Sequence, residues 1–328
     1  MRNMYKIIPV IYPSAGRFWL SSVHSLICYS INNCILTDLP ETGEFCYNAK
    51  DIRKAAEYLK LPLPLTLYAP EINKKRHNKS SIVYYHKQEF PKNSFVQFKI
   101  NEYNFFIARP ELCFLQAPGF HDFLDCVRFG TDLCAIYKED ASSLFGQANY
   151  SPVMSRQSLS EYLQTINNYG YPTRARQAFR YILNHSNSPI ETALGIACNL
   201  PWNRGGYKAG NLIMNYGIDL EKTAADLLGY NHVRVDLAWS GKRFAVEYNS
   251  NLTHLNSWQM AQDYNRLTAL HRSKWKTMVL TSANISEFEE LEKIMFELRA
   301  NLNLQKEQEL ADKYKSLRRA VMTRLFHW

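Results

Sequence analysis

Two short apolar runs separated by a polar tetrad form the clearest pattern along the chain. The runs span residues 232–239 and 244–249, and the tetrad Ser240–Arg243 lies between them. Both runs are rich in β-branched and aromatic residues, and a glycine-containing tetrad between such runs is a hairpin signal. The pattern predicts two antiparallel strands, in which Trp239 pairs with Phe244 and the pairing continues outward from the turn.

This register places Asp236 opposite Glu247. Because side chains alternate between the two faces of a strand, Arg234, Asp236, Glu247 and Asn249 would share one face, and the other face would be core. Opposed Cβ atoms lie about 5 Å apart, and like charges at that distance repel by about 3 kcal/mol at a dielectric constant of 20. A hard divalent cation would offset this repulsion, and so would the neighbouring Arg234.

The rest of the pattern predicts a mixed α+β chain. Residues 1–150 are expected to form a mixed α+β region, with a helix at residues 51–59 and strands at 82–85, 95–100 and 105–108. No motif in this region defines its role, and regulation or recognition is the hypothesis. Pro110 suits the first turn of a further helix. Residues 151–185 form a helical connector, because their apolar residues have the spacing of one buried helix face.

From residue 187 onward the pattern is helix, loop, strand, strand, helix, strand, helix, which suits an α/β unit. Ser188 and Ser286 each precede a glutamate by three residues and predict capping boxes at two helix starts. Residues 256–274 predict a helix and residues 277–281 a buried strand. After Asn284 the chain is helical and ends in an amphipathic basic stretch that contains Lys313, Lys315, Arg318, Arg319 and Arg324. This stretch would pack on its own domain, on DNA or on a partner helix.

The net charge and the absence of long apolar runs narrow the classes of protein to which the chain could belong. The chain has 328 residues and a net charge of +9, which favours a polyanionic partner. No run of about eighteen apolar residues is present to span a bilayer, and the N-terminus lacks a secretory pattern, so a cytoplasmic, non-membrane protein is expected. The seven cysteines have no metal-binding spacing and are expected to be buried thiols.

The polar residues of the C-terminal part occur in a defined order: Glu191 on a helix, Asp236 and Glu247 on the hairpin, His254 soon after it, and Gln259, Asp263 and Arg266 on the next helix. This order resembles the PD-(D/E)XK nuclease superfamily, and within it the very-short-patch-repair endonucleases and their bacterial relatives. In that pattern the third strand carries Glu-x-Asp-Gly or Glu-x-Asp-Ser followed by His. Here residues 247–250 read Glu-Tyr-Asn-Ser, and the resemblance covers roughly residues 186–285.

The resemblance implies a restriction-endonuclease-like mixed sheet flanked by helices in residues 186–328. It implies that Asp236 and Glu247 bind Mg²⁺ or Mn²⁺, with Glu191 joining them directly or through water. Glu191 has the alternative role of a helix cap. The metal would lower the pKa of an attacking water and neutralise charge on a DNA phosphate, and His254 would serve as general acid or base, with a surface-loop histidine as its alternative.

Four basic residues are candidates for binding the nucleic acid: Arg234, Lys242, Arg243 and Arg266. Arg266 would clamp a phosphate or pair with Asp263, which lies three residues before it on the same helix face. A homodimer would allow two sites to cut two strands, although no feature of the sequence requires one.

Asn249 departs from the family pattern, because it stands where the superfamily usually has lysine. Its amide can orient water but neither neutralises charge nor accepts a proton. The alternative to a nuclease is therefore a catalytically inactive DNA-binding regulator with the same fold. Residues 81–137 also show similarity to abortive-infection antitoxin-type proteins, which implies a protein partner in a phage-defence or toxin–antitoxin system.

Overall fold

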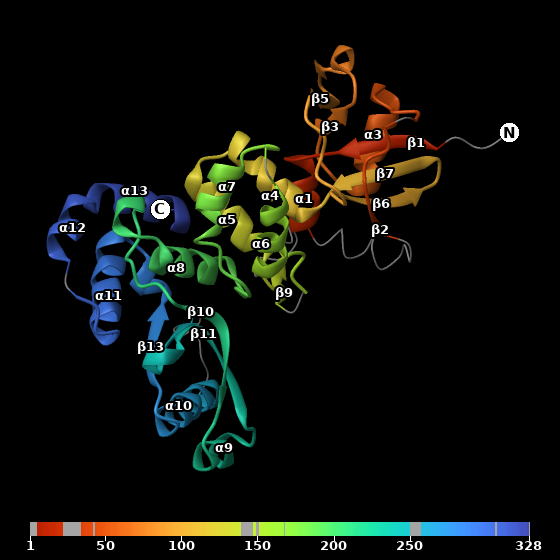
Figure 1. Cartoon of the computed structure of the whole chain (residues 1–328). Coiled ribbons are helices and arrows are strands. Elements are labelled where there is room, and N and C mark those ends of the chain that lie inside the picture. Colours follow the sequence, from red (N-terminus) through yellow and green to blue (C-terminus); the bar gives the residue numbers. More distant parts are fainter. Residues whose placement is uncertain are drawn as a thin grey trace. The chain divides into compact units, whose positions relative to one another are not determined.

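The computed structural model describes residues 5–21, 34–41, 43–138, 147–148, 151–166, 168–249, 257–305 and 307–327. The chain divides into two compact units, Met1–Arg180 and Tyr181–Trp328. Both units combine helices with a sheet (Figure 1). The mixed α+β class expected from the sequence is therefore confirmed.

A seven-stranded mixed sheet organises the first unit. Its strand order is β2-β6-β7-β1-β3-β5-β4. The strands are β1 (Lys6–Val10), β2 (Ile35–Thr37), β3 (Leu65–Ala69), β4 (Arg76–His77), β5 (Ser81–Tyr85), β6 (Phe95–Ile100) and β7 (Tyr103–Ala108). The central strand β1 runs parallel to β7 and antiparallel to β3, and its residues Ile8 and Val10 are fully buried. The expected strands at 82–85, 95–100 and 105–108 are all present.

Helices accompany this sheet: α1 (Ser14–Leu20), α3 (Ala49–Leu59), α4 (Pro110–Gln116), α5 (Phe123–Leu133), α6 (Arg156–Thr165) and α7 (Pro172–Phe179). A separate two-stranded ribbon consists of β8 (Tyr137–Lys138) and β9 (Gln147–Ala148). Helices α6 and α7 pack on α4 and α5. The expected connector 151–185 is thus helical, and as far as Arg180 it packs as part of the first unit.

The second unit contains a four-stranded sheet in the order β10-β11-β12-β13. Its elements, in chain order, are α8 (Pro189–Asn199), β10 (Ile213–Asp219), α9 (Lys222–Leu228), β11 (His232–Trp239), β12 (Phe244–Asn249), α10 (Ser257–Arg272) and β13 (Lys276–Thr281). Strand β11 is antiparallel to both β10 and β12, and β13 is parallel to β12. Helix α9 lies against α10 (Figure 1), and α8 contacts β11.

Two features of this unit differ from the sequence prediction. The region expected to be a loop before the hairpin contains β10 and α9; Asn215 and Gly217 lower the strand propensity of β10 and conceal it. Strand β13 is present, but only Leu280 among its six residues is buried, because β13 forms one edge of the sheet.

The C-terminal stretch packs on its own unit as three helices, α11 (Phe288–Asn301), α12 (Gln308–Lys313) and α13 (Lys315–Phe326). Helix α13 contacts α8 and α11. Arg318, one of the basic residues of this stretch, is 1% exposed. Its guanidinium donates to Glu292 and to the carbonyl of Ala311, and it lies over the ring of Trp202. This arginine is therefore part of the core rather than of a DNA-binding tail.

Five of the six cysteines for which the structure gives an environment are buried and free, as expected, and Cys34 is exposed. Within the described ranges, none of the helices has the length and apolar character needed to cross a lipid bilayer.

Candidate active site

The predicted hairpin is present, with its turn closed by the 3₁₀ segment Ser240–Lys242. The inner pairs Trp239–Phe244, Ala238–Ala245 and Leu237–Val246 have the expected register. Regular pairing ends there. The carboxylate of Asp236 accepts the backbone amide of Tyr248, with an N–O distance of 2.7 Å.

The expected direct opposition of Asp236 and Glu247 is therefore absent from the ladder of paired residues. Asn215 of β10, which has φ of +50°, interrupts the β10–β11 pairing beside Asp236. A positive φ departs from regular strand geometry, so Asp236 has no paired residue in the β10–β11 ladder either. The Asp236 side chain instead bridges to β12.

The face expected to be purely chemical is also partly core. Ala238 and Ala245 lie on it and are fully buried, in a cluster that includes Leu270 of α10. Asp236 and Glu247 are consequently half-buried beneath this helix and not exposed on an open sheet.

Burial and mutual repulsion shape the acidity of the carboxyl groups. Desolvation raises the pKa of Glu247 to about 7, and the nearby charge of Asp236 adds to this effect, whereas Arg266 opposes it. Desolvation also raises the pKa of Asp236. In Glu191 burial is again the largest cause, followed by the charge of Asp236, and together they raise its pKa to about 8. The three acids are therefore close enough to influence one another.

Glu191 has the cap role that was its alternative. The Ser188 hydroxyl accepts the Glu191 amide at 3.2 Å and donates to its carboxylate at 3.0 Å. The other carboxylate oxygen accepts the amide of Asn187 at 2.8 Å. Glu191 is 6% exposed, so it is a buried acid at the N-terminus of α8, held by three hydrogen bonds.

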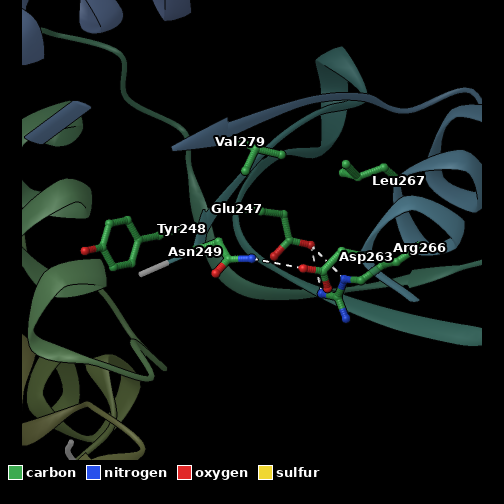
Figure 2. A pocket seen from close by; sticks show the side chains of 7 residues that line it. All are labelled: Glu247, Tyr248, Asn249, Asp263, Arg266, Leu267 and Val279. Atoms are coloured by element: carbon green, nitrogen blue, oxygen red, sulfur yellow. Dashed lines mark hydrogen bonds and ion pairs between the residues drawn. The ribbon is translucent and has the colours of Figure 1, made fainter. Parts of the chain in front are cut away.

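A pocket of about 220 Å³ opens between β12, β13 and α10. Its lining consists of Glu247, Tyr248, Asn249, Asp263, Arg266, Leu267 and Val279. Figure 2 shows the side chains of Glu247 and Asn249 pointing toward Asp263 and Arg266, whereas Tyr248 points away from them. The pocket is thus polar on one side, where two acids, an amide and a guanidinium meet.

Arg266 pairs with Glu247, and not with Asp263 as the sequence interpretation allowed. Its Nη2 and Nε atoms lie 2.8 and 3.2 Å from Oε1 of Glu247. Asp263 instead accepts a hydrogen bond from Nδ2 of Asn249 at 3.1 Å. The attraction of Glu247 outweighs desolvation and raises the pKa of Arg266, so this side chain is charged.

The other candidate residues lie in different places. The Arg234 side chain is exposed and its carbonyl oxygen accepts a hydrogen bond from Arg266. Lys242 and Arg243 are exposed at the turn of the hairpin, five and four residues before Glu247. His254 and the side chain of Gln259 lie outside the described residues.

The donor chemistry suits a hard cation in part. Mg²⁺ binds through one or two carboxylates and keeps several waters, and Asp236 with Glu247 would supply such a pair. Over the residues that the structure describes, no three His, Cys, Asp or Glu side chains are grouped closely enough to hold a metal ion. Glu191 therefore does not complete a three-residue ligand set with them in this arrangement.

The Arg266–Glu247 pair is the part of the site that the sequence did not reveal. Nineteen residues separate the two side chains, and no local spacing rule connects a strand residue with a residue on the following helix. Only the packing of α10 on the sheet brings them together.

No protein-family model, no curated protein and no solved structure matches this chain.

Proposed function

We propose that residues 186–328 form a Mg²⁺- or Mn²⁺-dependent phosphodiesterase that acts on DNA. The observation that carries the proposal is the pair of carboxylates Asp236 and Glu247 on neighbouring strands, whose charges act on each other and on Glu191 of α8. Of these acids, Glu247 lines the polar pocket. The order of α8, three antiparallel strands, α10 and the parallel strand β13 supports it, because it accommodates the PD-(D/E)XK pattern that the sequence resembles.

In this proposal Asp236 and Glu247 hold the cation, which supplies Lewis acidity and an acidified water when bound. The buried environment of both carboxylates strengthens their interaction with any cation, because the local dielectric constant is low. Tyr248 fixes the orientation of Asp236 through its backbone amide. Arg266 supplies positive charge at the rim of the pocket for a phosphate.

The second candidate function is a DNA-binding regulator that lacks catalysis. The observation that favours this function is Asn249. It stands where the PD-(D/E)XK superfamily usually has lysine, and its side-chain amide donates a hydrogen bond to Asp263. Such a side chain cannot stabilise the charge that develops on phosphate during hydrolysis.

Cleavage assays separate the two functions. Supercoiled, linear and single-stranded DNA are incubated with the wild-type protein in Mg²⁺, Mn²⁺ or EDTA. The double variant Asp236→Ala, Glu247→Ala is assayed in the same way. A matched control, Asp219→Ala, Glu221→Ala, removes two exposed carboxylates of the same unit. The phosphodiesterase predicts metal-dependent cutting by the wild type and the control, and a loss of at least about 100-fold in the site variant. DNA binding without cutting by all three proteins would establish the regulator instead.

A further inference from the structure

Two pairs of side chains connect strand β12 with helix α10. Glu247 and Asn249 are two residues apart and share a face of the strand, and Asp263 and Arg266 are three apart and share a face of the helix. Asn249 donates to Asp263, and Arg266 donates two N–H groups to one oxygen of Glu247 (Figure 2). Glu247, a candidate metal ligand, is thus already paired with a positively charged group, the guanidinium of Arg266.

The position of this guanidinium is fixed from two strands. Besides Glu247 on β12, its Nη2 atom donates to the carbonyl oxygen of Arg234 on β11. The Arg266 side chain remains 35% exposed, whereas that of Glu247 is 15% exposed. The buried acid is therefore neutralised by an arginine that still reaches solvent, from which a phosphate would approach.

We propose that Arg266 is a built-in counter-ion that exchanges partners: it neutralises Glu247 until a divalent cation binds there, and it is then released to bind the phosphate of the nucleic acid. This inference rests on the proposed function and concerns its regulation. A cation and a guanidinium compete for the same carboxylate oxygen, and they repel each other at close range. Guanidinium groups also bind phosphate through paired N–H donors, so the released side chain has a second partner.

Partner exchange couples the two binding events. A cation on Glu247 makes Arg266 available for phosphate, and a phosphate on Arg266 leaves Glu247 free for the cation. Coupling of this kind is reciprocal, so each ligand must strengthen the other by the same factor. Binding of nucleic acid would then increase the affinity of the pocket for the metal. Without the metal, Glu247 would remain paired with Arg266.

The test is Mn²⁺ binding, measured by calorimetry on the full chain. The variant Arg266→Gln removes the competing charge, and the control Arg272→Gln removes the same charge from an exposed position on the same helix, where the side chain donates to the carbonyl of Thr223. Without nucleic acid, we expect Arg266→Gln to bind Mn²⁺ about 10-fold more tightly than the wild type, a change of about 1.4 kcal/mol. The control should bind within about 2-fold of the wild type, because it keeps the Arg266–Glu247 pair.

The titration is repeated with a phosphorothioate-substituted DNA duplex present. Wild type and control should gain Mn²⁺ affinity, whereas Arg266→Gln should gain little, because its carboxylate no longer has a guanidinium to release. A separate measurement uses NMR on the wild-type protein. The side-chain Nε–H resonance of Arg266 should shift when Mg²⁺ is added, and this resonance is assigned by its absence from the spectrum of Arg266→Lys.

The outcomes distinguish the failure of partner exchange from the failure of the proposed phosphodiesterase function. Mn²⁺ binding that is equal or weaker in Arg266→Gln, or an Nε–H resonance that ignores Mg²⁺, would overturn the exchange and leave the phosphodiesterase standing. Absence of Mn²⁺ binding from the wild type and from both variants would remove both.

Discussion

Asp51 shows how this chain stabilises a buried charge. Its carboxylate accepts hydrogen bonds from Cys46, Tyr103, Asn48 and Lys6, at 2.8, 2.6, 2.5 and 3.0 Å. Burial alone would raise the pKa of Asp51, but these donors lower it well below the ordinary value. A depressed pKa means that the folded state binds fewer protons than the unfolded state, so the carboxylate stabilises the fold above about pH 4 and loses that effect as the pH falls further.

We predict that Asp51→Asn lowers the free energy of unfolding by about 2 kcal/mol at pH 7, because it leaves donors around a neutral group. The difference from the wild type should shrink between pH 4 and pH 2. Urea unfolding at pH 7, 5, 3 and 2 measures this difference, and the control is Asp125→Asn, which changes a half-exposed carboxyl group. A difference that stays constant down to pH 2 would contradict the assignment of the effect to charge.

Glu247 of the pocket and Glu191 of α8 have the opposite pKa shift, and this shift leads to a prediction about metal binding. Since the pKa of Glu247 is raised to about 7 and that of Glu191 to about 8, both groups are partly protonated near neutral pH. A cation favours the ionised forms. Mn²⁺ binding at pH 7 should therefore release about one proton, and affinity should rise between pH 6 and pH 8. Calorimetry in buffers of different ionisation enthalpy counts the protons; a count of zero would show that these acids are already ionised.

At the level of elements, the two Ser-x-x-Glu motifs have different outcomes although their sequence signals are alike. Ser188 caps α8. Ser286 caps nothing: α11 begins after Glu287, and the hydroxyl of Ser286 donates to the carbonyl of Ala283 at the end of a 3₁₀ segment. Thr281 and Asn284 form a capping box at the start of that 3₁₀ segment, and the N-cap residue of α11, Glu287, makes no side-chain cap hydrogen bond. The prediction for Ser286 was wrong because the chain makes an additional turn before the helix starts.

This contrast gives a matched pair of variants. Ser188→Ala should lower the free energy of unfolding by about 1 kcal/mol, since it removes a cap from α8 and a donor from the buried Glu191 carboxylate. Ser286→Ala should change it by less than about 0.5 kcal/mol. Chemical denaturation of both variants measures these values, and equal effects would show that the cap at Ser188 adds nothing specific.

The hairpin shows how far local sequence determines this site and where it fails. The turn and the alternation of apolar residues were sufficient to predict the strands and the three inner pairs of residues. They did not reveal the bridge from Asp236 to the Tyr248 amide, because a side-chain contact with the backbone of the next strand follows neither from the turn nor from the alternation of apolar residues. They also did not reveal that Arg266 forms an ion pair with Glu247, since that contact depends on the packing of α10 on the sheet. Local pattern thus located the acids, and non-local packing decides what each acid binds.

At the scale of the whole molecule, the chain divides into Met1–Arg180 and Tyr181–Trp328, and two buried charged groups each have their partners within one unit. Asp51 finds its donors within the first unit. Arg318 finds Glu292 within the second, and both of these side chains are buried. The sequence placed the start of the C-terminal domain at residue 186, close to this boundary, but it treated residues 151–185 as a separate connector. The amphipathic patterns of the helices in residues 156–179 do not indicate which unit they cover.

Units with separate cores are expected to unfold separately. Calorimetry of the full chain should show two transitions. Arg318→Ala should destabilise only one of them, by about 3 kcal/mol, because it leaves Glu292 buried without its partner. The adjacent control Arg319→Ala should cost less than about 1 kcal/mol, since its pair with Glu289 is half exposed.

Asp51→Asn should shift the other transition and leave the one sensitive to Arg318 in place. The two fragments 1–180 and 181–328, expressed separately, should reproduce one transition each, which assigns them. A single transition that both substitutions shift equally would mean that the two cores depend on each other. In that case the pocket at Glu247 would lose its structure whenever the first unit unfolds, and the carboxylates could not act as an independent nuclease module.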